Sequence, residues 1–188
     1  MGFIFRNSRN YRNIKTLLIL YFSLVRPSLE FGFMIWSPHA STISQDIENV
    51  QKRFLKYLFF KNFDYYPVEI KYVELLKIFR IQSLKKRRMV APLLFLHDLI
   101  QGRIQEPEML SKININVPRI NSRCRLIFRP PVPRTNALKQ SILYRACNLY
   151  NTIYNDSTDL YLDIFHQNRN SYRKTLADMN HWLLDPIF

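Results

Sequence analysis

Glycine and cysteine are scarce in this chain of 188 residues. The only three glycines are Gly2, Gly32 and Gly102, so the sequence contains neither a phosphate-cradling loop nor a Gly-x-Ser-x-Gly nucleophile turn. The two cysteines, Cys124 and Cys147, come without a signal-peptide pattern. They predict free thiols in a reducing compartment, the nucleus or the cytoplasm, and not a secreted protein. The Arg-rich, acid-free start mimics a mitochondrial presequence or signal anchor, but no small-residue cleavage site follows its apolar run.

The sequence also lacks recognisable groups of catalytic or metal-binding residues. The four histidines lie far apart and do not combine with the cysteines at zinc-binding spacing. No two aspartates are adjacent, whereas two-metal phosphoryl transfer needs clustered carboxylates. We therefore expect no catalytic residues, no metal site and no cofactor, and we interpret His97 and His166 as structural.

The sequence has no apolar run long enough to cross a membrane. A spanning helix needs about 20 mostly apolar residues, and the run from Thr16 to Val25 is half of that before Arg26 and Pro27 interrupt it. A charge at that depth and a helix-breaking proline both oppose insertion. We expect a buried helix that ends at Arg26, a second short helix that begins at Pro27, and no membrane partner.

Apolar and basic residues are abundant. The hydrophobic content is 47%, with 14 Phe, 11 Tyr and 2 Trp, which is enough for a packed core. The net charge of +14 favours polyanionic partners, most often nucleic acid. The interval between Glu108 and Asp156 contains no acid and eight cations, which predicts a partner surface in the middle of the chain. These cations are Lys112, Arg119, Arg123, Arg125, Arg129, Arg134, Lys139 and Arg145.

The clearest helical pattern begins near Thr42, which pairs with Gln45 as a capping box. A helical projection places apolar residues on one face and basic residues on the other. The apolar face comprises Ile43, Ile47, Val50, Phe54, Tyr57 and Leu58, and the opposite face comprises Asn49, Lys52, Arg53 and Lys56. The basic face is either a phosphate-contacting edge or an ordinary solvated surface with a Glu48 to Lys52 pair.

A later helix is predicted from Ser83, its N-cap, to Gly102, with Pro92 in its interior. Its first turns carry four consecutive cations, Lys85, Lys86, Arg87 and Arg88, where the helix dipole disfavours positive charge. This conflict indicates a nearby anion, and backbone N–H groups at a helix start together with four cations can hold a phosphate. Because consecutive residues point around the whole helix, one or two of these cations must instead serve packing or ion pairs.

The pattern as a whole predicts a mainly α fold. Further helices are expected from Pro67 to Phe79, at 107–110 and over 137–154, with weaker patterns at 160–167 and 171–179. The proline- and arginine-rich stretch between Val117 and Asn136 has no sustained helical period. We expect a helical region over 1–102, an irregular basic segment over 103–137 and a C-terminal helical extension over 138–188.

The order of six segments resembles the C-terminal part of reverse transcriptases from non-LTR (LINE-type, jockey-like) retrotransposons. The segments are LYFSLVRPSLEFGFMIWSP, DIENVQKRFLKYL, LKKRR with FLHDLIQG, INVPRINSR, FRPPVPRTN and RACNLYN. In that family they follow the catalytic palm, which carries an Ala-Asp-Asp signature, and form the helical thumb and the extension after it. The resemblance implies that Leu24 to Pro38 is a pair of buried helices, with Trp36 in the core.

The resemblance also implies a function. Because the chain lacks the palm and its Asp pair, we expect no polymerase activity; the upstream palm is a partner where the parent protein contains it. We expect sequence-independent binding of an RNA–DNA hybrid or DNA duplex through phosphates. The candidate contacts are Lys52, Arg53, Lys56, Lys85, Lys86, Arg87, Arg88, Arg119, Arg123, Arg125, Arg129 and Arg134.

The alternative is a structural or protein-interaction module from a decayed mobile element, with no role in nucleic-acid binding. Lys85 stands where the family commonly has an acidic residue. Pro92 lies inside a predicted helix, where an interior proline typically costs about 3 kcal/mol. Both departures are consistent with a truncated or decaying copy.

Overall fold

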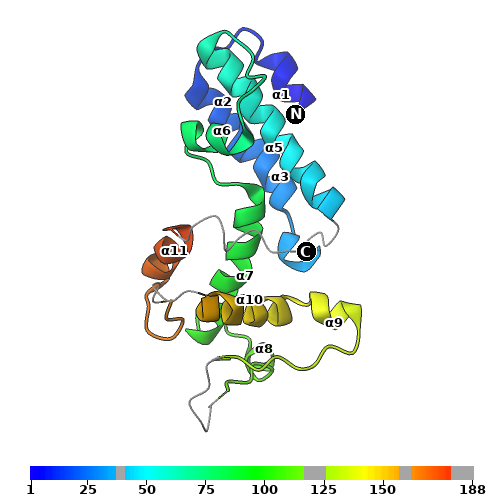
Figure 1. Ribbon diagram of the computed structural model, residues 1–188, viewed down its shortest axis with the longest axis vertical. Coiled ribbons are helices and arrows are strands. Elements are labelled where there is room, and N and C mark those ends of the chain that lie inside the picture. Colours follow the sequence, from blue (N-terminus) through cyan, green and yellow to red (C-terminus); the bar gives the residue numbers. More distant parts are fainter. Residues whose placement is uncertain (37–40, 117–125, 157–161, 179–188) are drawn as a thin grey trace. The chain divides into compact units, whose positions relative to one another are not determined.

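The computed structural model describes residues 1–36, 41–116, 126–156 and 162–178. The fold is mainly helical, as the sequence predicts (Figure 1). The chain divides into two compact units, Met1–Arg88 (unit 1) and Met89–Phe188 (unit 2). The boundary falls inside α7 (Leu84–Ile100). The three regions expected from the sequence, with limits at 102 and 137, stay predictions.

In unit 1, three consecutive helical elements follow one another without a loop: α2 (Ile14–Leu20), a π-helical turn η1 (Tyr21–Val25) and α3 (Arg26–Glu30). The side chain of Asn13 caps α2 by accepting from the backbone N–H of Lys15 at 2.9 Å. Pro27 lies in the first turn of α3. The backbone stays helical through Arg26, at φ −61° and ψ −43°, so the predicted helix end at Arg26 is wrong.

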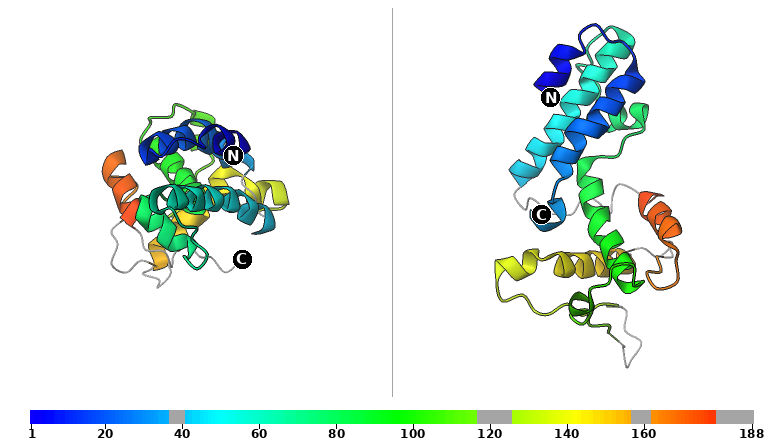
Figure 2. Two further views of the ribbon diagram at one scale, coloured as in Figure 1. Left: turned by 90° about the horizontal axis from the view of Figure 1, so that it is seen from above. Right: turned by 180° about the vertical axis from the view of Figure 1, so that it is seen from behind.

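The long helix α5 (Ser41–Phe63) packs alongside α2 and carries most of the unit 1 core (Figure 2). The Tyr21 and Phe54 rings stack with their centroids 4.3 Å apart. The short helix α1 (Gly2–Asn7) reaches α5 through Phe5, whose ring lies 4.6 Å from that of Tyr57. The buried residues of this core are Leu17, Tyr21, Phe54, Leu55, Leu58, Phe59 and Leu75.

The buried face of α5 differs from the predicted one. The helix begins at Ser41, so Thr42 lies inside it and is not its N-cap. Ile43 is 52% exposed, whereas Glu48 and Gln51 are buried. The predicted apolar face includes neither of these polar residues, but both have hydrogen-bond partners inside the unit, which offset the cost of burial. The expected pair between Glu48 and Lys52 is wrong, because the Glu48 carboxylate is buried and accepts hydrogen bonds inside the unit instead.

The expectation that Trp36 fills the core is also wrong. The side chains of Phe31, Ile35 and Trp36 are 82%, 84% and 45% exposed. Gly32, at φ +62°, lies between α3 and α4 (Phe33–Trp36), and Trp36 Nε1 donates to the carbonyl of Phe31 at 2.5 Å. Trp36 therefore closes a local turn, and its surface is left outside the unit 1 core.

The next helix, α6 (Tyr72–Phe79), begins at Tyr72 and not near Pro67. It ends at Arg80 in a left-handed conformation, φ 53°. The ends of α7 agree with the prediction: Ser83 Oγ accepts from the backbone N–H of Lys86 at 3.1 Å, and Gly102 follows the helix at φ +67°. Pro92 lies within α7, as predicted.

Removal of the Ser83 cap is expected to destabilise the chain modestly. Ser83→Ala leaves the Lys86 N–H without its side-chain acceptor, which typically costs about 1 kcal/mol of unfolding free energy. The measurement is urea unfolding followed by circular dichroism. Ser171→Ala is the control, because Ser171 is exposed inside α11, where alanine is a good helix former. Equal unfolding midpoints for the two variants would contradict the cap.

Unit 2 is built around α10 (Ile142–Asp156), preceded by α8 (Pro107–Leu110) and α9 (Asn136–Gln140). An isolated antiparallel bridge joins Ile115 to Phe128. Asn151 fixes this irregular segment to α10: its Oδ1 accepts from the N–H groups of Ile127 and Phe128 at 3.1 and 3.0 Å, and its Nδ2 donates to Phe128 O at 2.7 Å. Cys147, four positions before Asn151 on α10, is a buried free thiol, and burial raises its pKa to about 11.

The last helix, α11 (Arg169–Asp178), contacts α7 through polar side chains. Arg169 Nε donates to both carboxylate oxygens of Asp98 at 3.0 Å. The His97 ring stacks on Tyr172 at 4.7 Å, and its Nε2 lies 2.9 Å from the carbonyl of Gln167. The weak helical pattern at 160–167 is not borne out over 162–167, where the chain makes a turn at 164–166 and Asp163 Oδ1 accepts from Phe165 N at 2.8 Å; residues 160 and 161 lie outside the described residues.

Among the described residues, no helix combines the length and the apolar character that crossing a membrane requires.

Candidate nucleic-acid interface

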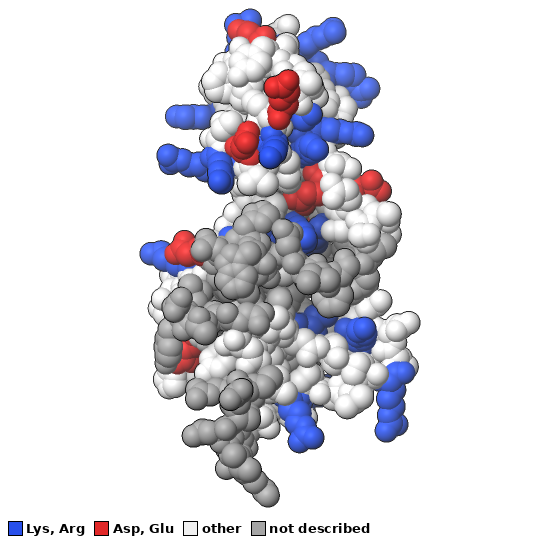
Figure 3. All heavy atoms as spheres, viewed as in Figure 1, with Lys and Arg blue, Asp and Glu red and all other residues white. Residues whose placement is uncertain are grey.

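Positive charge is concentrated in unit 1. Unit 1 contains 16 Lys and Arg against six Asp and Glu, and unit 2 contains 12 against eight. In the space-filling view, basic side chains project from unit 1 on both sides, with few acidic ones among them (Figure 3). The acid-free interval after Glu108 predicted a partner surface in what is now unit 2, but the larger excess of positive charge lies in the first 88 residues.

The anion expected at the start of α7 is a carboxylate of the chain itself. Glu48 accepts from the backbone N–H groups of Leu84 at 3.2 Å and Lys85 at 3.1 Å, and from the hydroxyl of Tyr72 at 2.8 Å. Burial and the Glu48 charge raise the pKa of Tyr72, so its phenol stays protonated and donates. The Glu48 carboxylate thus occupies the anion position at the start of α7 for which the sequence had suggested a phosphate.

Arg87 and Arg88 are engaged by side chains of unit 1, and their role as duplex contacts stays a prediction. Arg87 donates to both carboxylate oxygens of Glu30, through Nε and, at 2.9 Å, through Nη2. Arg88 is only 8% exposed, and its Nη2 donates to Ser44 Oγ at 2.9 Å. Burial lowers the pKa of Arg88, whereas the charges of Glu48 and Glu30 act in the opposite direction. Of the four cations at this helix start, Lys85 is exposed and Lys86 half-buried.

The three candidate cations of α5 lie at the surface. Arg53 is exposed, and Lys52 and Lys56 are half-buried. Lys56 Nζ lies 5.4 Å from the centroid of the Tyr66 ring. No ion pair between described residues involves any of the three. Arg53 and Lys56 are three positions apart and are therefore neighbours on one face of the helix.

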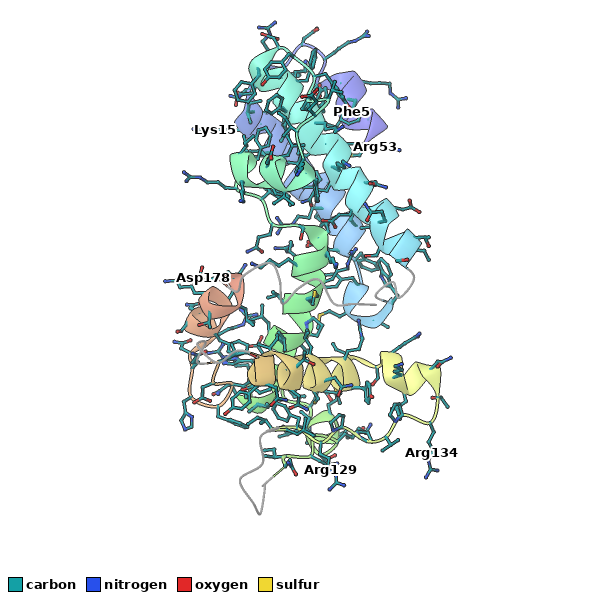
Figure 4. All side chains as sticks on the ribbon, in the orientation of Figure 1. Phe5, Lys15, Arg53, Arg129, Arg134 and Asp178 are labelled. Carbon is teal, nitrogen blue, oxygen red and sulfur yellow. The ribbon has the colours of Figure 1, made fainter. Side chains whose placement is uncertain are left out.

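Arg53 lines a hollow of about 220 Å³, which we call the aromatic hollow. Its wall comes from α1, α5 and the segment before α6, and Figure 4 shows Phe5 and Arg53 on the same side of unit 1. The residues that line it are Phe5, Arg53, Tyr57, Phe60 and Tyr66. The sequence reasoning missed its aromatic residues, although the density of rings in FLKYLFF and FDYYP is a visible signal.

The N-terminal part of unit 1 adds exposed cations that the sequence reasoning did not select. Arg6, Arg9, Arg12 and Lys15 are all exposed. Lys61 Nζ donates to the carbonyl of Arg9 at 2.5 Å, which ties this segment to the end of α5. The acid-free start of the chain could have indicated these cations, but it was interpreted as resembling a targeting sequence.

The remaining candidates belong to unit 2. Arg129 and Arg134 are exposed on the irregular segment (Figure 4). Arg119, Arg123 and Arg125 lie outside the described residues. Arg145, which belongs to the acid-free interval, is half-buried on α10, and burial lowers its pKa. The two units thus carry separate groups of candidate cations.

The described residues contain no group of three or more His, Cys, Asp or Glu side chains placed to hold a metal ion. Comparisons of the chain with family models, with curated proteins and with solved structures find no match.

Proposed function

We propose that this chain binds RNA–DNA hybrids or DNA duplexes through their phosphates, without sequence preference. In this proposal it is the thumb-like C-terminal part of a non-LTR retrotransposon reverse transcriptase, and it has no polymerase activity of its own. The upstream palm is its partner where the parent protein contains one. The nucleus or the cytoplasm is where such a chain acts.

The observation that supports this proposal best is the group of surface cations on α5. Lys52, Arg53 and Lys56 lie on a rigid helix of 23 residues, outside the ion pairs formed between described residues. Cations fixed on a regular element can follow a phosphate backbone, and each neutralised phosphate releases counterions. Phosphate contacts position a protein on a duplex without reading its bases.

The test is a titration of the folded chain against labelled RNA–DNA hybrid and DNA duplex at several salt concentrations. We expect the logarithm of affinity to fall linearly with the logarithm of salt, with a slope of about −0.9 per phosphate contact on B-form DNA. Two duplexes of unrelated sequence should bind alike. Affinity that does not change with salt, or that follows base sequence, would contradict backbone binding.

A protein-interaction module is the second candidate, because unit 1 also exposes large apolar side chains. Phe31 and Ile35 are more than four-fifths exposed, and Ile19 is 65% exposed. Exposed apolar surface of this kind is typical of protein contacts. Binding of the chain to a protein at high salt, together with no measurable affinity for either duplex, would favour this candidate.

A further inference from the structure

The aromatic hollow exposes two rings that the unit 1 core does not use. Phe60 is 42% exposed and Tyr66 is 56% exposed, while Tyr57 and Phe5 pack against each other behind them. Tyr57 is held in place by its hydroxyl, which lies 2.9 Å from Ser8 Oγ. The hollow therefore has a wall fixed by packing and a rim of two accessible aromatic rings.

The size of the hollow limits what it can receive. Its volume of about 220 Å³ is below the range of about 300–1,000 Å³ that is usual for drug-sized ligands and cofactors. A single planar ring is a suitable occupant. The lining is aromatic apart from Arg53, so the occupant should present an apolar face to the rings.

Positive charge beside the hollow indicates an anionic group attached to that ring. The Arg53 side chain lines the hollow, and Lys56 Nζ lies 5.4 Å from the Tyr66 ring centroid. An aromatic ring that is covalently linked to phosphate is the chemistry of a nucleotide. Aromatic side chains next to cations are the usual platform for single-stranded nucleic acid.

We propose that the aromatic hollow receives an unpaired base of a single-stranded extension next to the bound duplex. This inference rests on the proposed function and deepens it. Paired bases inside a duplex keep their faces stacked on each other, so they cannot stack on Phe60 or Tyr66. An unpaired base has a free face, and Arg53 and Lys56 are placed to contact the phosphates that flank it.

The experiment compares three ligands that share one RNA–DNA hybrid. The first is blunt, the second carries a short thymidine overhang, and the third carries an overhang of abasic residues with the same number of phosphates. Overhangs on the 5′ and 3′ sides are tested separately. Because the last two ligands have equal charge, a difference between them reports contacts to bases and should depend little on salt.

We expect the full chain to bind one of the thymidine overhangs more tightly than its abasic counterpart. Stacking of one base corresponds to about 5- to 150-fold in affinity, the equivalent of about 1–3 kcal/mol. The double variant Phe60→Leu/Tyr66→Leu should lose this preference and keep its affinity for the blunt hybrid, since leucine retains apolar bulk at two exposed positions. Tyr11→Leu is the matched control, because Tyr11 is 59% exposed and does not line the hollow.

The possible failures are distinguishable. Equal affinity for thymidine and abasic overhangs on both sides would overturn the base-binding hollow. The same conclusion would follow if the double variant still preferred the thymidine overhang, or if Tyr11→Leu also removed that preference. The proposed function fails separately, if the blunt hybrid is not bound or is bound without salt dependence.

Discussion

Glu48→Ala is expected to destabilise the chain by about 3–5 kcal/mol, the usual cost of removing one partner from a buried charged network. The variant leaves the backbone N–H groups of Leu84 and Lys85 and the Tyr72 hydroxyl without their acceptor. A buried donor left unpaired costs about 1–3 kcal/mol, and of the three hydrogen bonds to Glu48 the one from the Leu84 N–H is buried and the other two are part-buried. It also removes a negative charge that favours the buried guanidinium of Arg88. Urea unfolding of the full chain, followed by circular dichroism, measures the loss.

Two further variants separate the causes of that loss. Glu48→Gln keeps an oxygen acceptor and removes only the charge, so we expect a smaller destabilisation than with alanine. Asp46→Ala removes the same charge from an exposed position two residues away on α5, and should change the unfolding free energy by no more than about 0.5 kcal/mol. If Glu48→Ala were as mild as Asp46→Ala, Glu48 would not be the anion that stabilises the start of α7.

Glu48 also shows what the sequence could and could not predict. Ser83 and Gly102 mark the ends of α7 correctly because caps act on residues within a few positions of themselves. Pro27 did not end a helix, because the backbone stays helical from α2 into α3. The dipole conflict at Lys85 to Arg88 correctly required an anion. Its identity depends on Glu48, which is 36 positions from Leu84, and no local pattern contains that information.

Burial was harder to predict than helicity. The helical period of α5 identified Phe54 and Leu58 as core residues, yet it placed Ile43 with them and excluded Gln51. Periodicity counts apolar side chains, whereas burial depends on what packs against each position; Gln51 is buried because Tyr21 donates to its Oε1 at 2.8 Å. Trp36 was assigned to the core by family resemblance, and in unit 1 it is 45% exposed.

The candidate interface was predictable only in part. Lys52, Arg53 and Lys56 were selected from their face of the helix, and they lie at the surface. Arg87 and Arg88 were selected because the helix dipole disfavours cations at a helix start, but Glu30 and Ser44 engage them. A list of cations cannot distinguish these two cases, because the distinguishing partners come from other helices.

Arg53→Gln/Lys56→Gln is expected to weaken duplex binding and to make it less sensitive to salt. If each side chain contacts one phosphate of B-form DNA, the log–log slope becomes shallower by about 1.8. The affinity advantage of the parent over the variant should then shrink about 12-fold between about 50 and about 200 mM salt. Both substituted positions are on the surface of α5, so the helix and its core are expected to remain folded.

Arg173→Gln/Lys174→Gln is the matched control. It also removes one arginine and one lysine from exposed positions of a helix, but from α11 in unit 2, so both double variants have the same net charge. Fluorescence anisotropy with one labelled DNA duplex across the salt series measures the slope for parent, variant and control. Because the two variants differ only in where charge is lost, a general effect of net charge would shift both slopes equally. That result would remove α5 from the interface, whereas a change confined to the α5 variant assigns phosphate contacts to Arg53 and Lys56.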